Sequence, residues 1–197
     1  MDIIFQENFK VVSDEKDRQV KEIIRGLSKD KLNTAKPGLL KDFQFEEVAI
    51  EQDENKFDKR VEIIRLDAGQ SYGFNPGRQQ QFAAVVYKIP ILEGDSTTFQ
   101  LKPSSYSPKN FTEEINCTEK NIVFAIGTMN SNEVLTMEAI AEIKHTKARI
   151  LTFLNNNISN LNQDIVTYND KLETHMDKEI ENRKELLKKI EQELLEL

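Results

Sequence analysis

Cysteine and histidine, which serve as nucleophile, base and zinc ligand in many enzymes, are scarce in this chain. Its 197 residues include one cysteine, Cys117, and two histidines, His145 and His175. A single cysteine excludes an internal disulfide and a cysteine-rich zinc site. A cysteine nucleophile needs a histidine beside it, and both histidines lie in strongly helical sequence, outside any H-x-x-x-H or H-E-x-x-H pattern. We therefore expect no catalytic residues, no metal and no cofactor, and a chain that is not an enzyme.

One glycine-rich stretch has a composition that suits a small ligand. Residues 67–81 read DAGQSYGFNPGRQQQ. In this stretch Gly73 and Gly77 would let backbone amides approach an anion, and Arg78 would add a bidentate clamp. The stretch lacks the Lys-Ser/Thr pair of a Walker A loop and does not match G-x-G-x-x-G. It therefore predicts a loop between strands, with ligand binding by Gly73, Gly77 and Arg78 as the alternative.

Charge argues against nucleic acid and membrane surfaces as direct partners. The segment from Leu101 to Phe111 mixes two lysines with two aromatic residues, a composition that can also stack single-stranded bases. However, the chain has 34 acidic against 27 basic residues, a net charge of −7, and this segment has no wider basic patch. The acidic cluster at residues 46–54 could hold a hard cation, but a solvated turn explains it equally well. We expect no direct binding to nucleic acid.

The hydrophobic content of 38% is that of an ordinary globular domain, and no segment approaches the roughly 20 apolar residues of a membrane span. The first seven residues, MDIIFQE, lack the cationic start of a secretory signal. These features predict a cytoplasmic protein.

Two regions with different periodicity must position any site, and together they predict an α+β fold. Residues 1–129 form the first, with an amphipathic helix over 12–27 capped by Ser13, a polar connector over 28–38, and strands within 43–128. The strands favour a small, mostly antiparallel β-sandwich or open barrel. Its central strand would contain Phe82 to Tyr87, which are apolar at consecutive positions.

The second region, 130–197, is a helical arm, because residues 131–197 contain neither glycine nor proline. Ser131 or Asn132 could cap it. The asparagine run 155–157 and the Tyr168-Asn169-Asp170 segment could be a bend or the turn of a helical hairpin, since asparagine competes for helical backbone bonds. The arm is therefore either a hairpin or a rod that forms a coiled coil.

An apolar seam runs along the arm at steps of three and four residues. Such a seam is expected to be covered by another surface. Removing each Leu or Ile side chain from water stabilises the protein by about 1.5–3 kcal/mol as an upper estimate. The seam could dock on the chain's own β domain, fold back as a hairpin, or pair with a second copy. We favour a homo-oligomer, and the residues that we expect to mediate it are Leu172, Met176, Ile180, Leu187, Ile190 and Leu194.

Two stretches resemble a family of uncharacterised bacterial proteins. Residues 94–106 match G-D-x-x-x-F-x-x-x-P-S-[ST]-[FY], and residues 168–184 match [FY]-N-x-x-L-x(7)-I-E-x-R-[RK]. Longer members of that family continue into a restriction-endonuclease-like PD-(D/E)xK domain and look like bacterial defence or DNA-processing nucleases. No such core is present in this sequence, so the resemblance transfers no catalytic residue.

Three functions follow as hypotheses. In the first, the chain is a non-catalytic sensor or assembly module of a bacterial nuclease-type, antiviral defence protein, with the nuclease in the same or another chain. In the second, it is a free-standing coiled-coil adaptor without a nuclease partner. In the third, a small-ligand-binding β domain uses the loop at Gly73, Gly77 and Arg78.

Overall fold

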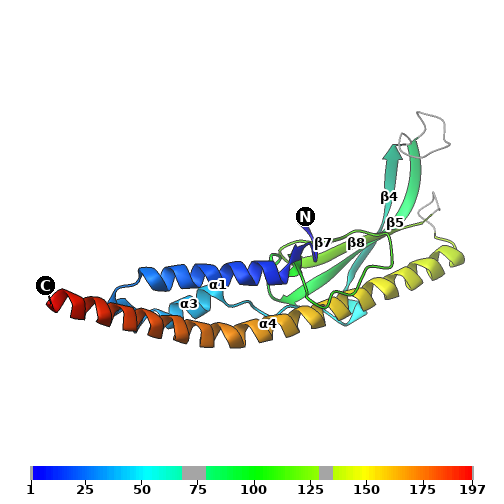
Figure 1. Cartoon of the computed structure of the whole chain (residues 1–197). Coiled ribbons are helices and arrows are strands. Elements are labelled where there is room, and N and C mark those ends of the chain that lie inside the picture. The colour runs from blue at the N-terminus through cyan, green and yellow to red at the C-terminus, as the bar shows by residue number, and fades with distance from the viewer. Residues whose placement is uncertain (1, 68–78, 129–134, 197) are drawn as a thin grey trace.

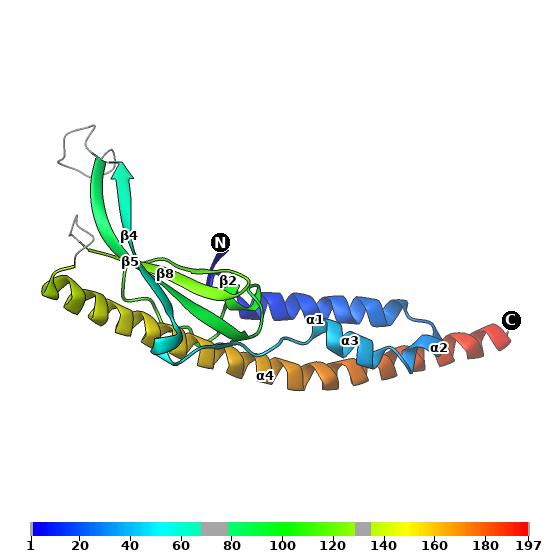
Figure 2. The same cartoon turned by 180° about the vertical axis from the view of Figure 1, so that it is seen from behind.

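The fold, given by a computed structural model that describes residues 2–67, 79–128 and 135–196, is α+β. It consists of an N-terminal helix, an open antiparallel sheet and one long C-terminal helix (Figure 1). The expected α+β class is confirmed, but the main sheet is open and antiparallel, and it is neither the expected sandwich nor the expected open barrel. The long helix runs the length of the molecule. The sheet lies over its first half and the N-terminal helix over its second half (Figures 1 and 2).

Helix α4 extends without interruption from Met137 to Leu195. Its 59 residues span about 90 Å at about 1.5 Å per residue. Of the two alternatives, hairpin and rod, the hairpin is therefore wrong, because neither the asparagine run at 155–157 nor the segment 168–170 breaks the helix. The side chain of Thr136 caps the helix by accepting a hydrogen bond from the backbone N–H of Ala139. The expected caps, Ser131 and Asn132, lie outside the described residues.

The sheet is built around β5 (Gln79–Glu93). β8 (Asn121–Gly127) pairs with one side of β5, followed outwards by β7 (Ile115–Cys117) and β1 (Asp2–Ile3). β4 (Asp58–Asp67) and the short β3 (Ala49–Ile50) also pair with β5, at different stretches of the strand. All these pairs are antiparallel. β5 is thus the central strand that the apolar run predicted, and residues 83–87 are all buried.

β4 and β5 form a long two-stranded ribbon that extends past the sheet. Their pairing runs from Asp58 with Lys88 to Asp67 with Gln79, whereas β8 joins β5 only from Ala84 onwards. The distal half of the ribbon therefore stands away from the body of the protein (Figures 1 and 2).

Helix α1 (Phe9–Gly26) begins three residues before the expected start. The side chain of Asn8 caps it by accepting a hydrogen bond from the N–H of Lys10. The expected cap, Ser13, instead lies inside the helix, where its hydroxyl donates to the carbonyl of Lys10. The expected polar connector is also wrong in part, because it contains α2 (Lys29–Leu32) and the start of α3 (Lys36–Phe43).

Four short elements complete the described part of the chain. A parallel pair joins β2 (Glu7–Asn8) to β6 (Leu101–Lys102). Two 3₁₀ turns, η1 (Glu54–Lys56) and η3 (Thr98–Gln100), precede β4 and β6.

One apolar core joins the two regions that composition separates. Leu154, Leu161 and Ile165 of α4 are fully buried in the same cluster as Ile89 and Phe124 of the sheet. Aromatic contacts connect α4 to the surrounding segments in two groups. These groups are Phe5, Tyr106, Phe111 and Phe153, and Phe9, Phe45 and Tyr168. None of the described helices is long and apolar enough to cross a membrane.

Polar side chains on both flanks of this apolar stripe bind extended segments to α4. On one flank, Asn155, Asn162 and Asn169 recur every seven residues and so share one helix face. Asn162 accepts from the N–H of Val48 at 2.9 Å and donates to its C=O at 2.9 Å. Asn169 does the same for Phe45, at 3.0 and 2.8 Å.

The other flank holds the segment at residues 104–107 in the same way. Asn157 accepts from the N–H of Ser107 at 2.9 Å and donates to its C=O at 3.1 Å, and Asp164 accepts from the N–H of Ser104. Asn157, Asn162 and Asn169 therefore satisfy backbone groups of other segments. Asn157 also donates to the carbonyl of Phe153 in its own helix, and α4 stays continuous at this position.

Candidate functional site

Catalytic groups do not converge in the part of the chain that the structure describes. No cluster of three or more His, Cys, Asp or Glu side chains that could hold a metal occurs among these residues. Cys117 is buried at the end of β7, and its thiol contacts the carbonyl of Thr118. His145 lies exposed on α4, and His175 is half-buried 30 residues further along the same helix. The predicted ligand residues Gly73, Gly77 and Arg78 lie outside the described residues.

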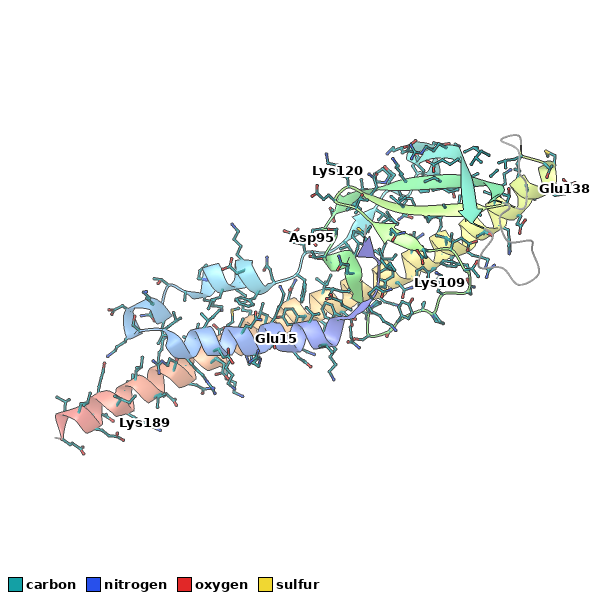
Figure 3. The ribbon with its side chains drawn as sticks, turned by 90° about the horizontal axis from the view of Figure 1, so that it is seen from above. Glu15, Asp95, Lys109, Lys120, Glu138 and Lys189 are labelled. Carbon is teal, nitrogen blue, oxygen red and sulfur yellow. The ribbon has the colours of Figure 1, made fainter. Side chains whose placement is uncertain are left out.

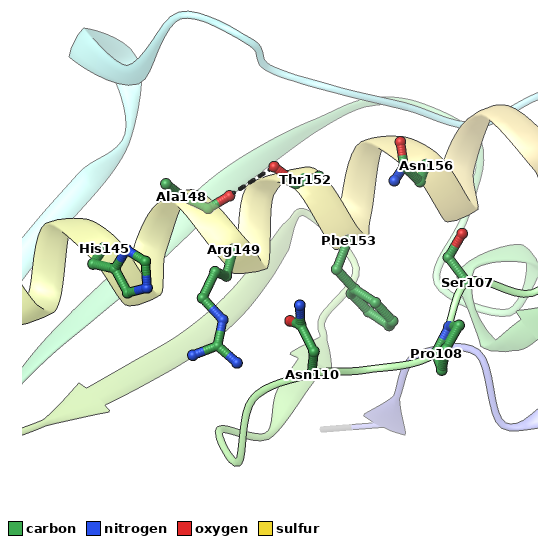
Figure 4. A pocket seen from close by; sticks show the side chains of 9 residues that line it. All are labelled: Ser107, Pro108, Asn110, His145, Ala148, Arg149, Thr152, Phe153 and Asn156. Atoms are coloured by element: carbon green, nitrogen blue, oxygen red, sulfur yellow. Dashed lines mark hydrogen bonds between the residues drawn. The ribbon is translucent and has the colours of Figure 1, made fainter.

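A cavity of about 260 Å³ lies between α4 and the segment that follows β6 (Figure 4). His145 and Arg149 project into it from one face of the helix, opposite Asn110 and Ser107. An imidazole, a guanidinium and an amide can donate hydrogen bonds to a small anion. The remaining lining, which includes Phe153 and Pro108, supplies no carboxylate base, and the hydroxyl of Thr152 donates to the carbonyl of Ala148 in its own helix.

The lysine and aromatic side chains of the 101–111 segment contact each other inside the fold. The ammonium of Lys102 lies 4.4 Å from the centre of the Tyr106 ring, and that of Lys109 lies 5.2 Å from the Phe111 ring. Both rings also pack edge-on against Phe153 of α4. The two aromatic rings that suggested base stacking are therefore part of the packing between this segment and the helix.

A larger groove of about 710 Å³ lies between α1, α3 and η3, and it contains Lys16 and Asp95. Burial lowers the pKa of the Lys16 ammonium, and the charge of Asp95 partly opposes this. Lys16 donates to the carbonyl of Phe43 at 3.1 Å and lies 4.2 Å from the centre of the Phe45 ring. Through these two contacts, Lys16 holds α1 against the end of α3.

The acid dependence of stability should contain a contribution from Asp95. Burial alone would raise the pKa of this carboxyl, but hydrogen bonds from Thr97 and Thr98 outweigh burial and leave the pKa below its usual value. A lowered folded-state pKa stabilises the fold above the unfolded-state pKa, and this contribution is lost as the pH falls through the folded-state pKa. We expect urea unfolding to show a smaller loss of stability between neutral pH and about pH 3 in Asp95→Asn than in the natural chain. An identical loss in both proteins would contradict this role.

Half of the predicted self-association seam is buried by the chain's own helices. Leu172, Met176 and Ile180 belong to the single core cluster, beneath the short N-terminal helices. In this fold, these three side chains are not available to a second copy. The reason is that α1 runs alongside α4, as the ion pair between Lys21 and Glu179 shows.

The other half of the seam continues on the same helix face. There, no described segment of the chain covers the apolar side chains completely. Eighteen residues make five turns of an α-helix at about 3.6 residues per turn, so residues eighteen apart point in the same direction. Leu172 is 1% exposed and Ile190 is 41% exposed. Met176 is 0% exposed and Leu194 is 64% exposed, and Tyr168 and Leu186 show the same contrast at 7% and 49%.

We call Leu186, Ile190 and Leu194 the distal face. It becomes exposed where α1 has ended at Gly26 and only the four-residue α2 remains beside α4. Leu187, another predicted seam residue, is half-buried against the core at the edge of this face. Figure 3 shows Lys189 on this part of α4, which extends past the end of α1.

The residues that carry the family resemblance are structural in this fold. Gly94 adopts a left-handed backbone with φ +80°, Asp95 caps η3, and Phe99 is fully buried. Tyr168 is buried, and Asn169 binds the backbone of Phe45. No protein-family model, curated protein or solved structure matches the chain.

Some features of these sites were missed from sequence. The cavity beside Arg149 and the groove beside Lys16 each combine segments that are far apart in the chain, so no local pattern marked them. The asparagine contacts did have a signal, because Asn155, Asn162 and Asn169 lie seven residues apart, beside the apolar stripe.

Proposed function

We propose that this chain is a non-catalytic assembly module that associates with a second copy of itself through the distal face of α4. The observation that carries the proposal is the contrast between residues at the same angle on one helix. Leu172 and Met176 are covered, whereas Ile190 and Leu194 are open to solvent. A contiguous apolar stripe that remains exposed is typical of a protein interaction surface.

The scarcity of convergent reactive groups in the described part of the chain supports an assembly function over an enzymatic one. The cavity beside Arg149 has no carboxylate base in its lining, and Lys16 is held by a carbonyl and an aromatic ring. The long helix supports the same function, because it places the distal face far from the sheet and its projecting ribbon (Figure 1). A partner bound at one end would leave the other end accessible.

Charges placed on the distal face should prevent self-association. We expect light scattering to show that the natural chain passes from monomer to dimer as its concentration rises. The double variant Ile190→Glu/Leu194→Glu should stay monomeric, because burying four carboxylates in a dimer of this variant costs more than the contact provides. Both side chains are exposed, so the monomer should keep its thermal stability within about 0.5 kcal/mol.

Val166→Glu provides the matched control. Val166 lies on the same helix with 45% exposure, but not on the distal face. This variant should dimerise like the natural chain. A natural chain that is monomeric at every concentration would overturn the proposal, and so would equal disruption by Val166→Glu.

We further propose that the protein assembled through this chain, in the same or another polypeptide, is a bacterial defence nuclease. This part rests on the resemblance at residues 94–106 and 168–184, in which the apolar motif positions Phe99, Tyr168, Leu172 and Ile180 are buried. The test is the DNA sequence after codon 197. A continuous reading frame that encodes an Asp…Glu-x-Lys core is the expected result, and a stop codon would instead favour the free-standing adaptor.

A further inference from the structure

We propose that the two copies pair antiparallel through the distal face, with a two-fold axis opposite Ile190. This inference rests on the proposed self-association and adds its direction and register. It follows from how charge is distributed along the last part of α4, a feature independent of the exposed apolar side chains.

The end of α4 divides into a basic half and an acidic half. Residues 183–189 contain four basic residues and one acidic residue, a net charge of +3. Residues 190–197 contain three acidic residues and no basic residue, a net charge of −3. Parallel copies would place like charges together, whereas antiparallel copies place the basic half of each against the acidic half of the other.

The described ion pairs leave most of these charges available. Glu191 pairs with Lys29 at 2.7 Å, and Lys184 lies 3.9 Å from Glu181. Lys188, Lys189 and Glu193 are exposed and form no ion pair with any other described side chain. The last turn of α4 contains no basic residue to offset the negative end of the helix dipole. In the antiparallel pair, the other copy's lysines supply that charge.

The apolar side chains select the register. An axis opposite Ile190 places Leu186 of each copy against Leu194 of the other, because each residue lies four positions from Ile190. The same axis brings Lys189 of each copy beside Glu193 of the other, because each flank of the seam faces the same flank of an antiparallel partner. The interface is then isologous, since the same patch is used on both copies and the pair closes without leaving a free face.

The magnitudes indicate why charge decides the geometry. The apolar contact consists of three side chains from each copy, all at least 41% exposed in the single chain. Burying each of them therefore contributes less free energy than the roughly 1.5–3 kcal/mol gained when a fully exposed side chain is buried. The sum is similar to the estimated cost of association, about 4–15 kcal/mol. A dimer of moderate affinity is expected, and repulsion between like charges in the parallel arrangement would remove it.

Disulfide trapping of the full-length chain tests the direction. The variants Leu186→Cys, Leu194→Cys and Ile190→Cys are oxidised separately and as a mixture of the first two, and products are resolved on a non-reducing gel. Antiparallel pairing predicts a covalent dimer from the mixture of Leu186→Cys and Leu194→Cys, and little from either variant alone. In that geometry, identical cysteines lie about 12 Å apart along the helix, beyond the reach of a disulfide.

Two controls make the test decisive. Ile190→Cys lies on the axis and should form a covalent dimer in either direction. The natural chain should form none, because its only cysteine, Cys117, is buried. Efficient self-linking of Leu186→Cys would indicate parallel pairing and overturn this inference while leaving self-association intact. If Ile190→Cys fails to cross-link and light scattering finds only monomer, the proposed function fails as well.

Charge reversal provides a second readout. Lys188→Glu/Lys189→Glu and Glu193→Lys/Glu196→Lys should each weaken dimerisation at least tenfold, because each variant sets like charges against each other. An equimolar mixture of the two should associate again. The difference in affinity between this mixture and either variant alone should become smaller as salt is added. Unchanged dimerisation of both variants would contradict the role assigned to charge.

Discussion

Replacing Gly94 with alanine should lower the free energy of unfolding by about 2–4 kcal/mol. Gly94 follows β5 and has φ +80°, a backbone conformation that side chains with a Cβ rarely adopt. A Cβ at this position would lie 2.5 Å from Cγ1 of Val48 and 3.0 Å from the carbonyl oxygen of Glu47. Val48 is 1% exposed and its backbone is held by Asn162, so it cannot move aside easily. Urea unfolding followed by circular dichroism measures this loss.

Gly38→Ala is the matched control for Gly94→Ala. Gly38 lies within α3, and apart from its own helix backbone and chain neighbours nothing lies within 4 Å of the position that its Cβ would take. Alanine should therefore stabilise the protein slightly, by up to about 1 kcal/mol, because glycine is a poor helix former. Equal effects of the two substitutions would show that backbone conformation and crowding at Gly94 do not matter.

Replacing Asn157 with leucine should lower the free energy of unfolding by about 2–4 kcal/mol. The Asn157 side chain is 0% exposed and binds both backbone groups of Ser107, while its amide also donates to the carbonyl of Phe153. Leucine is close in size but leaves the N–H and C=O of Ser107 without these partners. A buried polar group without a partner costs about 1–3 kcal/mol. The same unfolding measurement detects this effect.

Asn156→Leu tests whether the effect belongs to the contact or to helix propensity. Asn156 is the neighbouring residue on α4, and it is exposed at the edge of the cavity in Figure 4. Leucine forms helices better than asparagine does, so this variant should be neutral or slightly more stable. Similar destabilisation by both variants would contradict a stabilising role for the hydrogen bonds between Asn157 and the backbone of Ser107.

The proposed self-association would place a different requirement on α4 from the one that folding does. Folding uses the face at Leu172 and Met176, and the proposed dimer uses the same face five turns later, at Ile190 and Leu194. Substitutions in the first set should unfold the chain. Substitutions in the second should change only its oligomeric state. Separate measurements of stability and mass can therefore distinguish the two functions of one helix.

The amino-acid sequence by itself determined the α+β class, the long helix and the central strand. The absence of glycine and proline after residue 131 and the steps of three and four allow a continuous helix, and the run from Phe82 to Tyr87 predicts a buried strand. These are local properties, because propensity and periodicity act between residues that are close in the chain. The hairpin prediction failed because it treated the asparagines of α4 by propensity alone, although their partners lie in other segments.

Only the tertiary structure decided which part of the seam is covered. Leu172 and Ile190 belong to the same apolar pattern, and nothing near either residue in the chain distinguishes them. The difference arises because α1 ends at Gly26 and the chain then turns back through α2 and α3, so that the cover stops before the distal face. Burial depends on contacts between residues more than a hundred positions apart, and periodicity along one helix carries no information about them.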